Sequence, residues 1–365
     1  MSEPRPFRID IPYAQLADLQ ARLGSTRWQQ SIDAAEWEYG ANQEYIQELC
    51  AYWADGYDWR AAEARLNSYD QVLVPADGVD LHALHVRSAD PSAWPLVLVH
   101  GWPGSIWEFM GLIEQLSDFH LIVVSLPGFG FSGKPRERGW NVTRVAAACD
   151  TLMASLGYSS YAAQGGDWGG VIATQLAVSF PQRCRAIHLN QASVPLPPVL
   201  PAELQEWKRN MDRYLRRESA YRQIQETKPD SLTLALNDSP AGLAAWIIEK
   251  FRAWGETGGD VESVFSKDDL ITNLMLYWLP GSAGSAARIY REFRYDAAAR
   301  ALEPVEVPTA IAAFPGEPFS FPRQLVEHRY RDLRRWTDMA AGGHFGAMEQ
   351  PGLLAHDIRE FFADL

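Results

Sequence analysis

The chain has 365 residues, of which 47% are hydrophobic and 22% charged, a composition typical of one large globular domain with accessory segments. The net charge of −13, with no Lys/Arg cluster, argues against nucleic acid as a partner. No apolar run approaches the roughly 18 residues of a membrane span, and the start, MSEPRPFRID, lacks the apolar core of a signal peptide. The three cysteines (Cys50, Cys149 and Cys184) have no CxxC spacing and predict neither disulfides nor a zinc site. We therefore expect a soluble, cytoplasmic protein without a metal.

Residues 1–95 predict an accessory region rather than an independent domain. The stretch PYAQLADLQARL has the periodicity of an amphipathic helix, and residues 37–67 are rich in Trp and Tyr with little strand alternation. The segment QVLVPADGVDLHALHV then predicts a β-hairpin that turns at Asp77-Gly78. We expect this region to pack against the rest of the chain.

Residues 96–195 predict the first part of an α/β core. Short apolar runs in WPLVLVHGWPGS, HLIVVSLPGFG and YAAQGGDWGG end in glycine-rich loops, and helical stretches separate them. Buried strands that alternate with helices predict a mostly parallel central sheet with helices on both faces. The alternation stops at VPLPPVLP. Residues 196–297 then predict a helical cap inserted over the sheet edge, and residues 298–365 complete the core.

The segment Gly165-Gly166-Asp167-Trp168-Gly169 has the spacing of the nucleophile elbow of serine hydrolases, with an acid at its centre. A tight turn with Asp167 as a helix N-cap is the alternative. The elbow is favoured because YAAQG before it reads as a strand and VIATQLAVSF after it as a helix. An aspartate is ionised at neutral pH and attacks a saturated carbon without a base, which produces an alkyl-enzyme ester. Asp167 is therefore predicted to be a nucleophile.

A second loop, His100 to Ser105, follows the apolar run LVLV. In hydrolases of this architecture such a loop donates one backbone N–H to the oxyanion hole, and the residue after the nucleophile donates the other. We therefore expect the N–H groups of Trp102 and Trp168 to form an oxyanion hole. The Trp102–Pro103 bond is expected to be cis, because a tight loop must aim the Trp102 N–H at the oxyanion and X–Pro bonds have only a small trans preference. His100 is expected to brace the loop rather than to act as an acid or base.

A base and an acid that orients it should follow the nucleophile in chain order. His344 stands in the glycine-flanked loop MAAGGHFGAMEQP before the last helix, and Glu317 follows the strand-like AIAAF. Asp332 and Asp338 compete with Glu317, but Asp332 reads as part of an exposed helix and Asp338 as part of a strand. The predicted set is thus Asp167, Glu317 and His344. The other histidines lie in strand, helix or surface contexts and are expected to be structural: His82, His85, His120, His188, His328 and His356.

The segment GFGFSG, residues 128–133, fits the dinucleotide pattern G-x-G-x-x-G. A dinucleotide site also needs a helix that opens at the last glycine and an acid at the end of the next strand. Here Lys134-Pro135 and a charged stretch intervene, and Asp150 falls inside a helical run. No cofactor is therefore expected.

The motifs HGWPGS, GGDWGG, ETKPDSLTLALNDSPAGLAAWIIEKF, AFPGE and GGHFGAMEQP together resemble the microsomal-type epoxide hydrolases of the α/β-hydrolase fold, which include the juvenile-hormone epoxide hydrolases. The resemblance covers nearly the whole chain. Residues 1–95 resemble the N-terminal domain of that family, which wraps the core, but without the membrane anchor of some relatives. The resemblance implies that a small apolar epoxide and water react to form a vicinal diol. The ester on Asp167 would be hydrolysed by water that His344 and Glu317 activate.

The resemblance also implies two tyrosine donors to the epoxide oxygen: Tyr221 in RRESAYRQIQETKPD and Tyr290 in AARIYREF. Two alternatives stay open. A haloalkane dehalogenase would share Asp167 and His344 but hold halide with the indole N–H groups of Trp102 and Trp168. A non-catalytic small-molecule receptor would use the fold without the reaction. The natural epoxide, its stereochemistry and homo-oligomerisation are not predicted.

Overall fold

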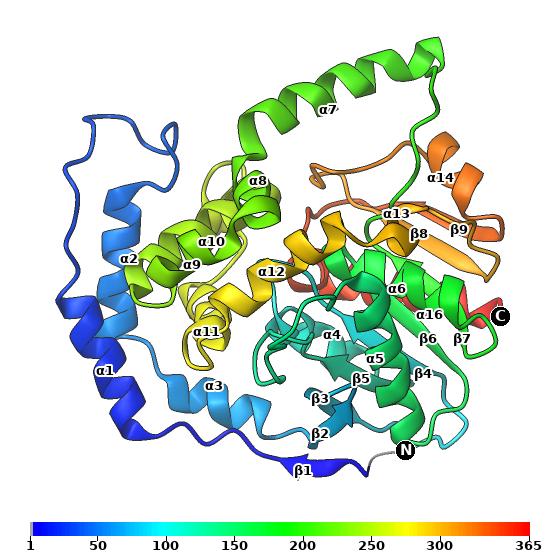
Figure 1. The fold of residues 1–365 in the computed structure, drawn as a ribbon, viewed down its shortest axis with the longest axis horizontal. Helices are drawn as coiled ribbons and strands as arrows, with labels where there is room; N and C mark the ends of the chain where they lie inside the picture. Colours follow the sequence, from blue (N-terminus) through cyan, green and yellow to red (C-terminus); the bar gives the residue numbers. More distant parts are fainter. Residues whose placement is uncertain (1–2) are drawn as a thin grey trace.

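The computed structural model describes residues 3–365, and within them nine strands form one sheet in the order β1-β2-β3-β5-β4-β6-β7-β8-β9 (Figure 1). Neighbouring strands from β5 to β9 in this order are parallel. The pairs β1–β2, β2–β3 and β3–β5 are antiparallel. The predicted, mostly parallel sheet is confirmed. Its parallel members are β4 (Pro95–Val99), β5 (His120–Val124), β6 (Tyr161–Gly165), β7 (Cys184–Leu189), β8 (Thr309–Ala313) and β9 (Leu333–Asp338).

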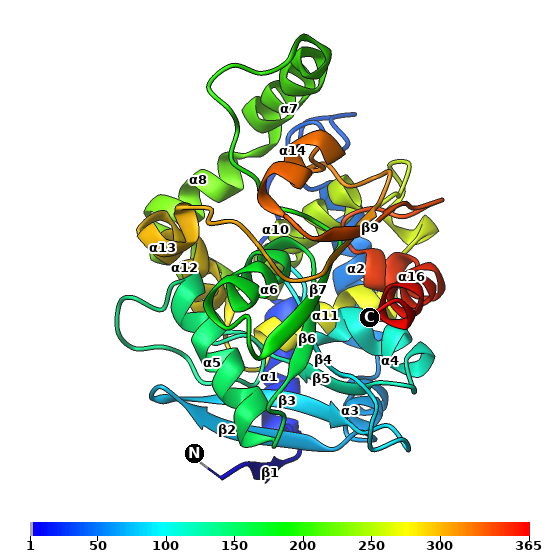
Figure 2. The same cartoon turned by 90° about the vertical axis from the view of Figure 1, so that its right-hand side faces the viewer.

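The central strands are mostly apolar and almost entirely buried because helices cover both faces of the sheet. Every residue of β5 and β6 is buried. In Figure 2, α5 (Val142–Ser155) and α6 (Asp167–Ser179) cover one face, and α4 (Met110–Gln115) and α16 (Pro351–Ala363) cover the other. This arrangement brings the carboxyl ends of the parallel strands, and the loops that follow them, to one edge of the sheet.

The N-terminal region extends the sheet as well as wrapping it. Strand β1 (Arg5–Phe7) pairs with β2 (Gln71–Ala76), and β2 forms the predicted hairpin with β3 (Val79–Val86). The hairpin turns at Asp77 and Gly78, with φ angles of 49° and 85°. Helices α1 (Tyr13–Gly24), α2 (Gln43–Asp55) and α3 (Trp59–Leu66) run along the side of the molecule (Figure 1).

Side chains of the N-terminal helices α1 and α2 contact the cap. The Trp53 indole N–H points at the Met275 sulfur, 3.2 Å away, and the Tyr52 hydroxyl donates to Asp268 at 2.9 Å. Arg22 of α1 forms an ion pair of 2.7 Å with Asp238. These contacts fix cap helix α11 and the loop before α10 to a segment more than 200 residues earlier in the chain.

The cap is helical, as predicted, and is inserted between β7 and β8. Its main helices are α7 (Gln205–Glu218), α8 (Ala220–Thr227), α9 (Pro229–Leu236), α10 (Pro240–Trp254), α11 (Lys267–Trp278) and α12 (Ala283–Arg294). Short helical turns complete the fold: η1 (Ile106–Phe109), η2 (Ala202–Leu204), η3 (Val261–Ser263), α13 (Ala297–Arg300), α14 (Arg323–Arg329) and α15 (Gly346–Glu349). No helix in residues 3–365 is both long and apolar enough to cross a membrane.

One local expectation is wrong. Asp332 lies in a turn directly before β9 and not in an exposed helix. Its carboxylate pairs with Arg334 two residues later, so that a local ion pair accounts for the charge.

Candidate active site

Asp167 stands at the sharp turn between β6 and α6, with a left-handed φ of 49°. Non-glycine residues rarely adopt such a φ, and the surrounding structure must hold them there. Gly169 makes the turn feasible, because a methyl group at its position would overlap the carbonyl oxygen of Val99 on β4. The elbow thus raises the carboxylate of Asp167 above the sheet edge, against the loop that follows β4.

The loop after β4 aims a backbone donor at this carboxylate. The N–H of Trp102 donates to Oδ1 of Asp167 at 2.8 Å, and the Trp102–Pro103 bond is cis, as predicted. His100 braces the loop, as expected: its Nδ1 donates to the carbonyl oxygen of Gly101 at 2.9 Å, and its Nε2 accepts from the N–H of Leu126 at 3.2 Å. Burial lowers the pKa of His100 to about 4, so its ring is neutral at pH 7.

Two residues of α11 that the sequence analysis missed support the same loop. The Asn273 amide donates to the carbonyl oxygen of Pro103 at 2.9 Å and accepts from the Ser105 hydroxyl at 2.7 Å. The Tyr277 hydroxyl donates to the carbonyl oxygen of Gly104 at 2.7 Å. A lone Asn or Tyr on a helix carries no signal of such a role, because the contacts join positions about 170 residues apart.

His344 and Glu317 meet beside Asp167, as the predicted set requires. Nδ1 of His344 lies 2.8 Å from Oε2 of Glu317, and Nε2 of His344 lies 3.8 Å from Oδ2 of Asp167. The Glu317 carboxylate also accepts from the N–H of Phe319 at 2.8 Å and from the amide of Gln191 at 3.3 Å. The bond to Glu317 holds the imidazole so that Nε2 faces the nucleophile. Asp338, the competing acid, accepts instead from the indole of Trp336.

The charges of the three groups are coupled. Burial raises the pKa of Asp167, and the positive charge of His344 and the N–H groups of Trp102 and Trp168 oppose this rise. Burial lowers the pKa of His344, but the charge and hydrogen bond of Glu317, with the charge of Asp167, outweigh it and raise the pKa to about 9. The resting site therefore holds an imidazolium between two carboxylates at neutral pH.

Glu349 fixes the loop that carries His344. Its carboxylate accepts from the backbone N–H groups of Gly343, Phe345 and Glu256, all within 2.9 Å. The N–H of His344 itself donates to the carbonyl oxygen of Trp254 at 2.9 Å. The loop is thereby held against the C-terminal end of cap helix α10.

Tyr221 and Tyr290 reach the same place from helices α8 and α12. The Tyr221 ring stacks on the Trp102 ring with centroids 5.3 Å apart, and the Tyr290 ring lies edge-on to the Trp168 ring at 4.7 Å. Burial raises the pKa of both phenols well above the usual value, so both stay protonated at neutral pH. Among the described residues the Tyr290 hydroxyl has no hydrogen-bond partner. A buried donor without a partner is free to bind a ligand oxygen.

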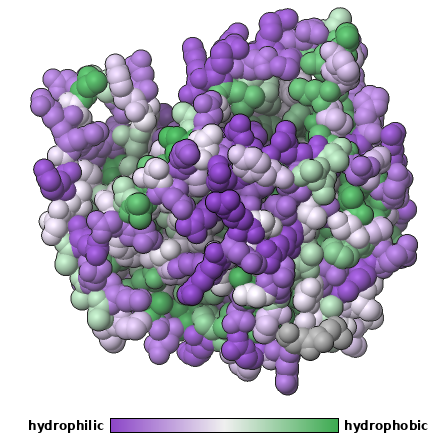
Figure 3. Space-filling model, in the orientation of Figure 1, coloured by the Kyte–Doolittle hydropathy of each residue, from purple (hydrophilic) through white to green (hydrophobic). Residues whose placement is uncertain are grey.

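A cavity of about 290 Å³ lies between the nucleophile and the two phenols. Asp167, Tyr221 and Tyr290 line it together with a largely apolar wall. Helix α7 supplies Trp207, Met211 and Leu215, spaced four residues apart on one face. Figure 3 shows apolar side chains gathered beneath α7 while its outer side is hydrophilic. The remaining wall residues include Val171, Ala192, Leu196, Phe293, Phe319 and Phe321.

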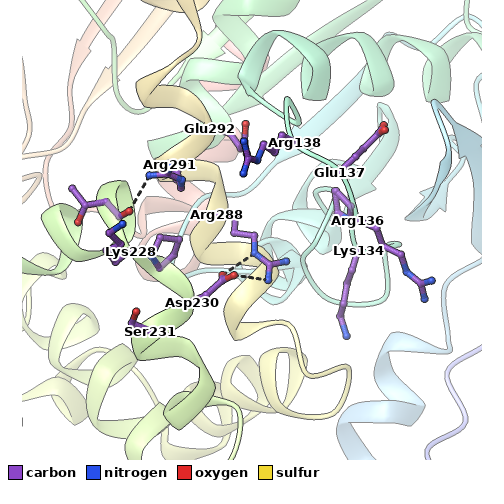
Figure 4. Close-up of a pocket in the computed structure, with 13 residues that line it drawn as sticks. Lys134, Arg136, Glu137, Arg138, Lys228, Asp230, Ser231, Arg288, Arg291 and Glu292 are labelled. Atoms are coloured by element: carbon purple, nitrogen blue, oxygen red, sulfur yellow. Dashed lines mark hydrogen bonds and ion pairs between the residues drawn. The ribbon is translucent and has the colours of Figure 1, made fainter.

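A larger cavity, of about 650 Å³, lies outside this site and is lined mainly by charged residues (Figure 4). Two contacts there join α12, which carries Tyr290, to α8 and α9. Arg288 of α12 binds Asp230 with two hydrogen bonds of 2.8 and 3.1 Å, and Arg291 donates to the carbonyl oxygen of Thr227 at 2.9 Å. They hold α12 against the junction of α8 and α9. Within residues 3–365 no cluster of His, Cys, Asp and Glu has the composition of a metal site.

The fold and this arrangement define a hydrolase of the α/β-hydrolase class. Residues 95–231 match the family model described as "alpha/beta hydrolase fold", and residues 4–109 match "Epoxide hydrolase N terminus". The chain is 37% identical to epoxide hydrolase 1 of Sus scrofa, over 98% of this chain and 88% of that protein. It is 36% identical to juvenile hormone epoxide hydrolase 2 of Ctenocephalides felis, over 97% and 84% of the two chains.

Solved structures agree. The crystal structure of juvenile hormone epoxide hydrolase from Bombyx mori superposes with a TM-score of 0.93 at 30% identity, covering 100% of this chain and 95% of that one. The epoxide hydrolase of Aspergillus niger superposes with a TM-score of 0.89 at 30% identity, covering 99% and 96%. The chain therefore belongs to the family of microsomal-type and juvenile-hormone epoxide hydrolases and is an epoxide hydrolase. This membership favours the predicted activity over the dehalogenase and receptor alternatives.

Proposed function

We propose that the protein converts a small apolar epoxide to a vicinal diol in two steps, through an alkyl ester on Asp167. The observation that carries the proposal is the hydrogen bond between Glu317 and Nδ1 of His344, which leaves Nε2 of the same ring facing Asp167. An imidazole held in this way can activate water next to an ester on Asp167. The apolar wall of the 290 Å³ cavity supports a small apolar substrate.

In the first step a carboxylate oxygen of Asp167 attacks one epoxide carbon. The bond between that carbon and the ring oxygen breaks, and the departing oxygen takes a proton from a phenol. The imidazolium of His344 then gives up one proton while the phenolate takes one up, so that the second step begins with neutral phenols and a neutral imidazole. Tyr221 and Tyr290 are the proposed donors, since both are protonated at neutral pH and line the cavity with Asp167. A hydrogen bond to an alkoxide is stronger than one to an ether oxygen, so the phenols stabilise the transition state more than the substrate.

In the second step His344 takes a proton from water, and the water oxygen bonds to the carboxyl carbon of Asp167. The backbone N–H groups of Trp102 and Trp168 are proposed to stabilise the resulting oxyanion, which agrees with the bond from Trp102 to Oδ1. The ester bond then breaks, and the diol oxygen takes the proton from His344. Glu317 orients the imidazole and stabilises its charge without taking the proton.

We further propose that each part of the chain has the role expected from the sequence. Residues 96–195 and 298–365 form the catalytic core, residues 196–297 form a cap that carries the phenols, and residues 1–95 form an accessory region that braces both. The contacts of Trp53 and Tyr52 with the cap support the last assignment.

A single-turnover reaction in heavy-oxygen water tests the ester. The first diol formed should contain ordinary oxygen from Asp167, and the solvent label should enter the protein. Diol that carries only solvent oxygen in the first turnover would exclude the ester. An aryl epoxide and a haloalkane assayed side by side should give turnover of the epoxide only.

A further inference from the structure

Lys250 is a buried cation that the proposed mechanism does not use. It lies in the last two turns of cap helix α10, and only 5% of its surface is exposed. Lysine is almost never buried to this extent unless its charge is paired. The partner here is Glu249, the preceding residue of the same helix, whose side chain is partly exposed. An ammonium group has three donors, so one carboxylate partner leaves it able to interact with further groups.

The other neighbours of the Lys250 ammonium are aromatic rings. Its Nζ atom lies over the Tyr221 ring, 4.7 Å from the ring centroid, and 5.9 Å from the centroid of the Trp254 ring. Trp254 stands one helical turn after Lys250, and its ring lies against the Tyr221 ring with centroids 5.2 Å apart. A cation within about 6 Å of a ring centroid is attracted by the electron-rich face of the ring, most strongly where water is excluded. Helix α10 thus holds a positive charge against the ring of one proposed proton donor.

The two phenols differ in this contact. Within residues 3–365 no Lys or Arg side chain lies over the Tyr290 ring. Burial lowers the pKa of Arg222, but Glu226 and the two phenols outweigh it and raise the pKa, so this guanidinium interacts with both phenols. Lys250 is therefore the cation that distinguishes Tyr221 from Tyr290.

Lys250 lies behind Tyr221 and does not reach the substrate. Both phenols line the 290 Å³ cavity, whereas Lys250 is not part of its wall. A phenol that loses its proton becomes richer in electrons, so a cation over its ring attracts the phenolate more strongly than the phenol. The ammonium therefore stabilises Tyr221 most when negative charge develops on its oxygen, which happens as the epoxide ring opens.

We propose that Lys250 is a positioning residue that acts through Tyr221: it makes Tyr221 the phenol that passes its proton to the departing epoxide oxygen, while Tyr290 donates a hydrogen bond. The inference rests on the proposed function and divides the first step between the two phenols. The O–H bond of Tyr221 breaks as its proton bonds to the alkoxide oxygen, and the phenolate that remains lies under the Lys250 ammonium. The phenolate then takes up a proton as the imidazolium of His344 gives one up, and Lys250 keeps its own protons throughout.

Two variants test this role in the full-length enzyme: Lys250→Met, which removes the charge at similar volume, and Lys250→Arg, which keeps it. Single-turnover kinetics would measure formation and decay of the ester separately. We expect Lys250→Met to slow ester formation by about 5- to 30-fold, the effect of losing one buried cation–π contact, and to change ester decay by less than about twofold. Lys250→Arg should restore most of the formation rate. Lys267→Met, on a lysine of cap helix α11 that pairs with Glu262, is the matched control and should behave as the parent.

A double-mutant cycle with the tyrosines separates this role from packing. In a Tyr290→Phe background, Lys250→Met should slow ester formation as much as it does in the parent. In a Tyr221→Phe background it should have no further effect, because phenylalanine has no proton to give. Slowing of the same size in both backgrounds would overturn the inference. Parental ester formation in Lys250→Met would overturn it too, and so would equal slowing of both steps together with a lower melting temperature.

If Lys250→Met does not fold, Lys250→Gln takes its place, since it is also neutral and keeps a hydrogen-bond donor for Glu249. Loss of folding in both neutral variants would show that the charge serves the fold, and would overturn the inference. Failure of the proposed function gives a different result, because then the parent enzyme and a His344→Gln variant would form no ester at all.

Discussion

Nε2 of His344 lies 3.8 Å from Oδ2 of Asp167, beyond hydrogen-bond reach, whereas Nδ1 of the same ring lies 2.8 Å from Glu317. The base is thus anchored on its far side and keeps its near side open toward the nucleophile. This asymmetry suits a base that acts on water after the nucleophile has reacted.

His344→Gln should stop the second step and leave the first intact. With no base to activate water, the ester should accumulate, and intact-mass analysis should find one substrate mass added to the protein. His356→Gln, at an exposed position of α16, is the control and should show no adduct. Full turnover without an adduct would remove His344 from the mechanism.

Glu317→Gln should have a milder effect than His344→Gln. The amide can still bond to Nδ1 of His344, but it no longer stabilises the imidazolium, so ester decay should slow without stopping. Rapid-quench measurement of the ester would test this. An unchanged decay rate would show that the charge of Glu317 has no catalytic effect.

Tyr221→Phe and Tyr290→Phe should each slow ester formation, and the double change should nearly abolish it. Removal of one oxyanion-type donor typically costs about 10²–10³ in rate, and the loss should be smaller here while the other phenol remains. Ester decay should be almost unchanged. Tyr295→Phe, on a tyrosine that is 66% exposed, is the matched control. Parental ester formation in the double variant would revive the dehalogenase alternative.

The pKa of His344 should fall when the ester forms. In the free enzyme it is raised to about 9, partly by the charge of Asp167, and esterification removes that charge. Ester decay needs the neutral ring, so its rate should fall as the pH drops through a pKa below about 9. Ester formation needs ionised Asp167, so it should be lost only at lower pH, through a pKa raised above 3.8. One identical pKa for both steps would contradict this account.

Asp357 should contribute to stability and not to catalysis. Its buried carboxylate binds His188 at 3.0 Å and Arg335 and Thr337 at 2.6 Å each. Asp357→Ala should lower the free energy of unfolding by about 3–5 kcal/mol, the usual cost of breaking a buried pair. Glu360→Ala, on the exposed side of α16, should change it by less than about 0.5 kcal/mol. Urea unfolding of both variants would measure this.

The contribution of Asp357 should also depend on pH. Burial raises the pKa of this carboxyl group, but the bonds from His188, Thr337 and Arg335 outweigh burial and lower it below the usual value. A lowered folded-state pKa stabilises the protein above the unfolded value of about 3.9. This stability is lost as the pH falls below that value, so acid should destabilise the parent more steeply than Asp357→Ala.

Local patterns in the sequence were sufficient for the architecture and for much of the candidate site. Apolar runs with glycine-rich ends predicted the parallel strands, because buried strands and tight turns leave local signatures. The elbow at Asp167, the loop at Trp102 and the base at His344 follow such signatures too. The two tyrosines had no local signature and were assigned only through the resemblance to a known family.

The sequence by itself determined which residue types stand at the ends of the strands, and with them the acid at the elbow and the order of Asp167, Glu317 and His344. Only the tertiary structure decided which distant groups complete the site. Asn273 and Tyr277 support the Trp102 loop through contacts that no spacing encodes. The physical reason is that burial and the neighbours across the fold, rather than neighbours in the chain, set the charge and orientation of a side chain.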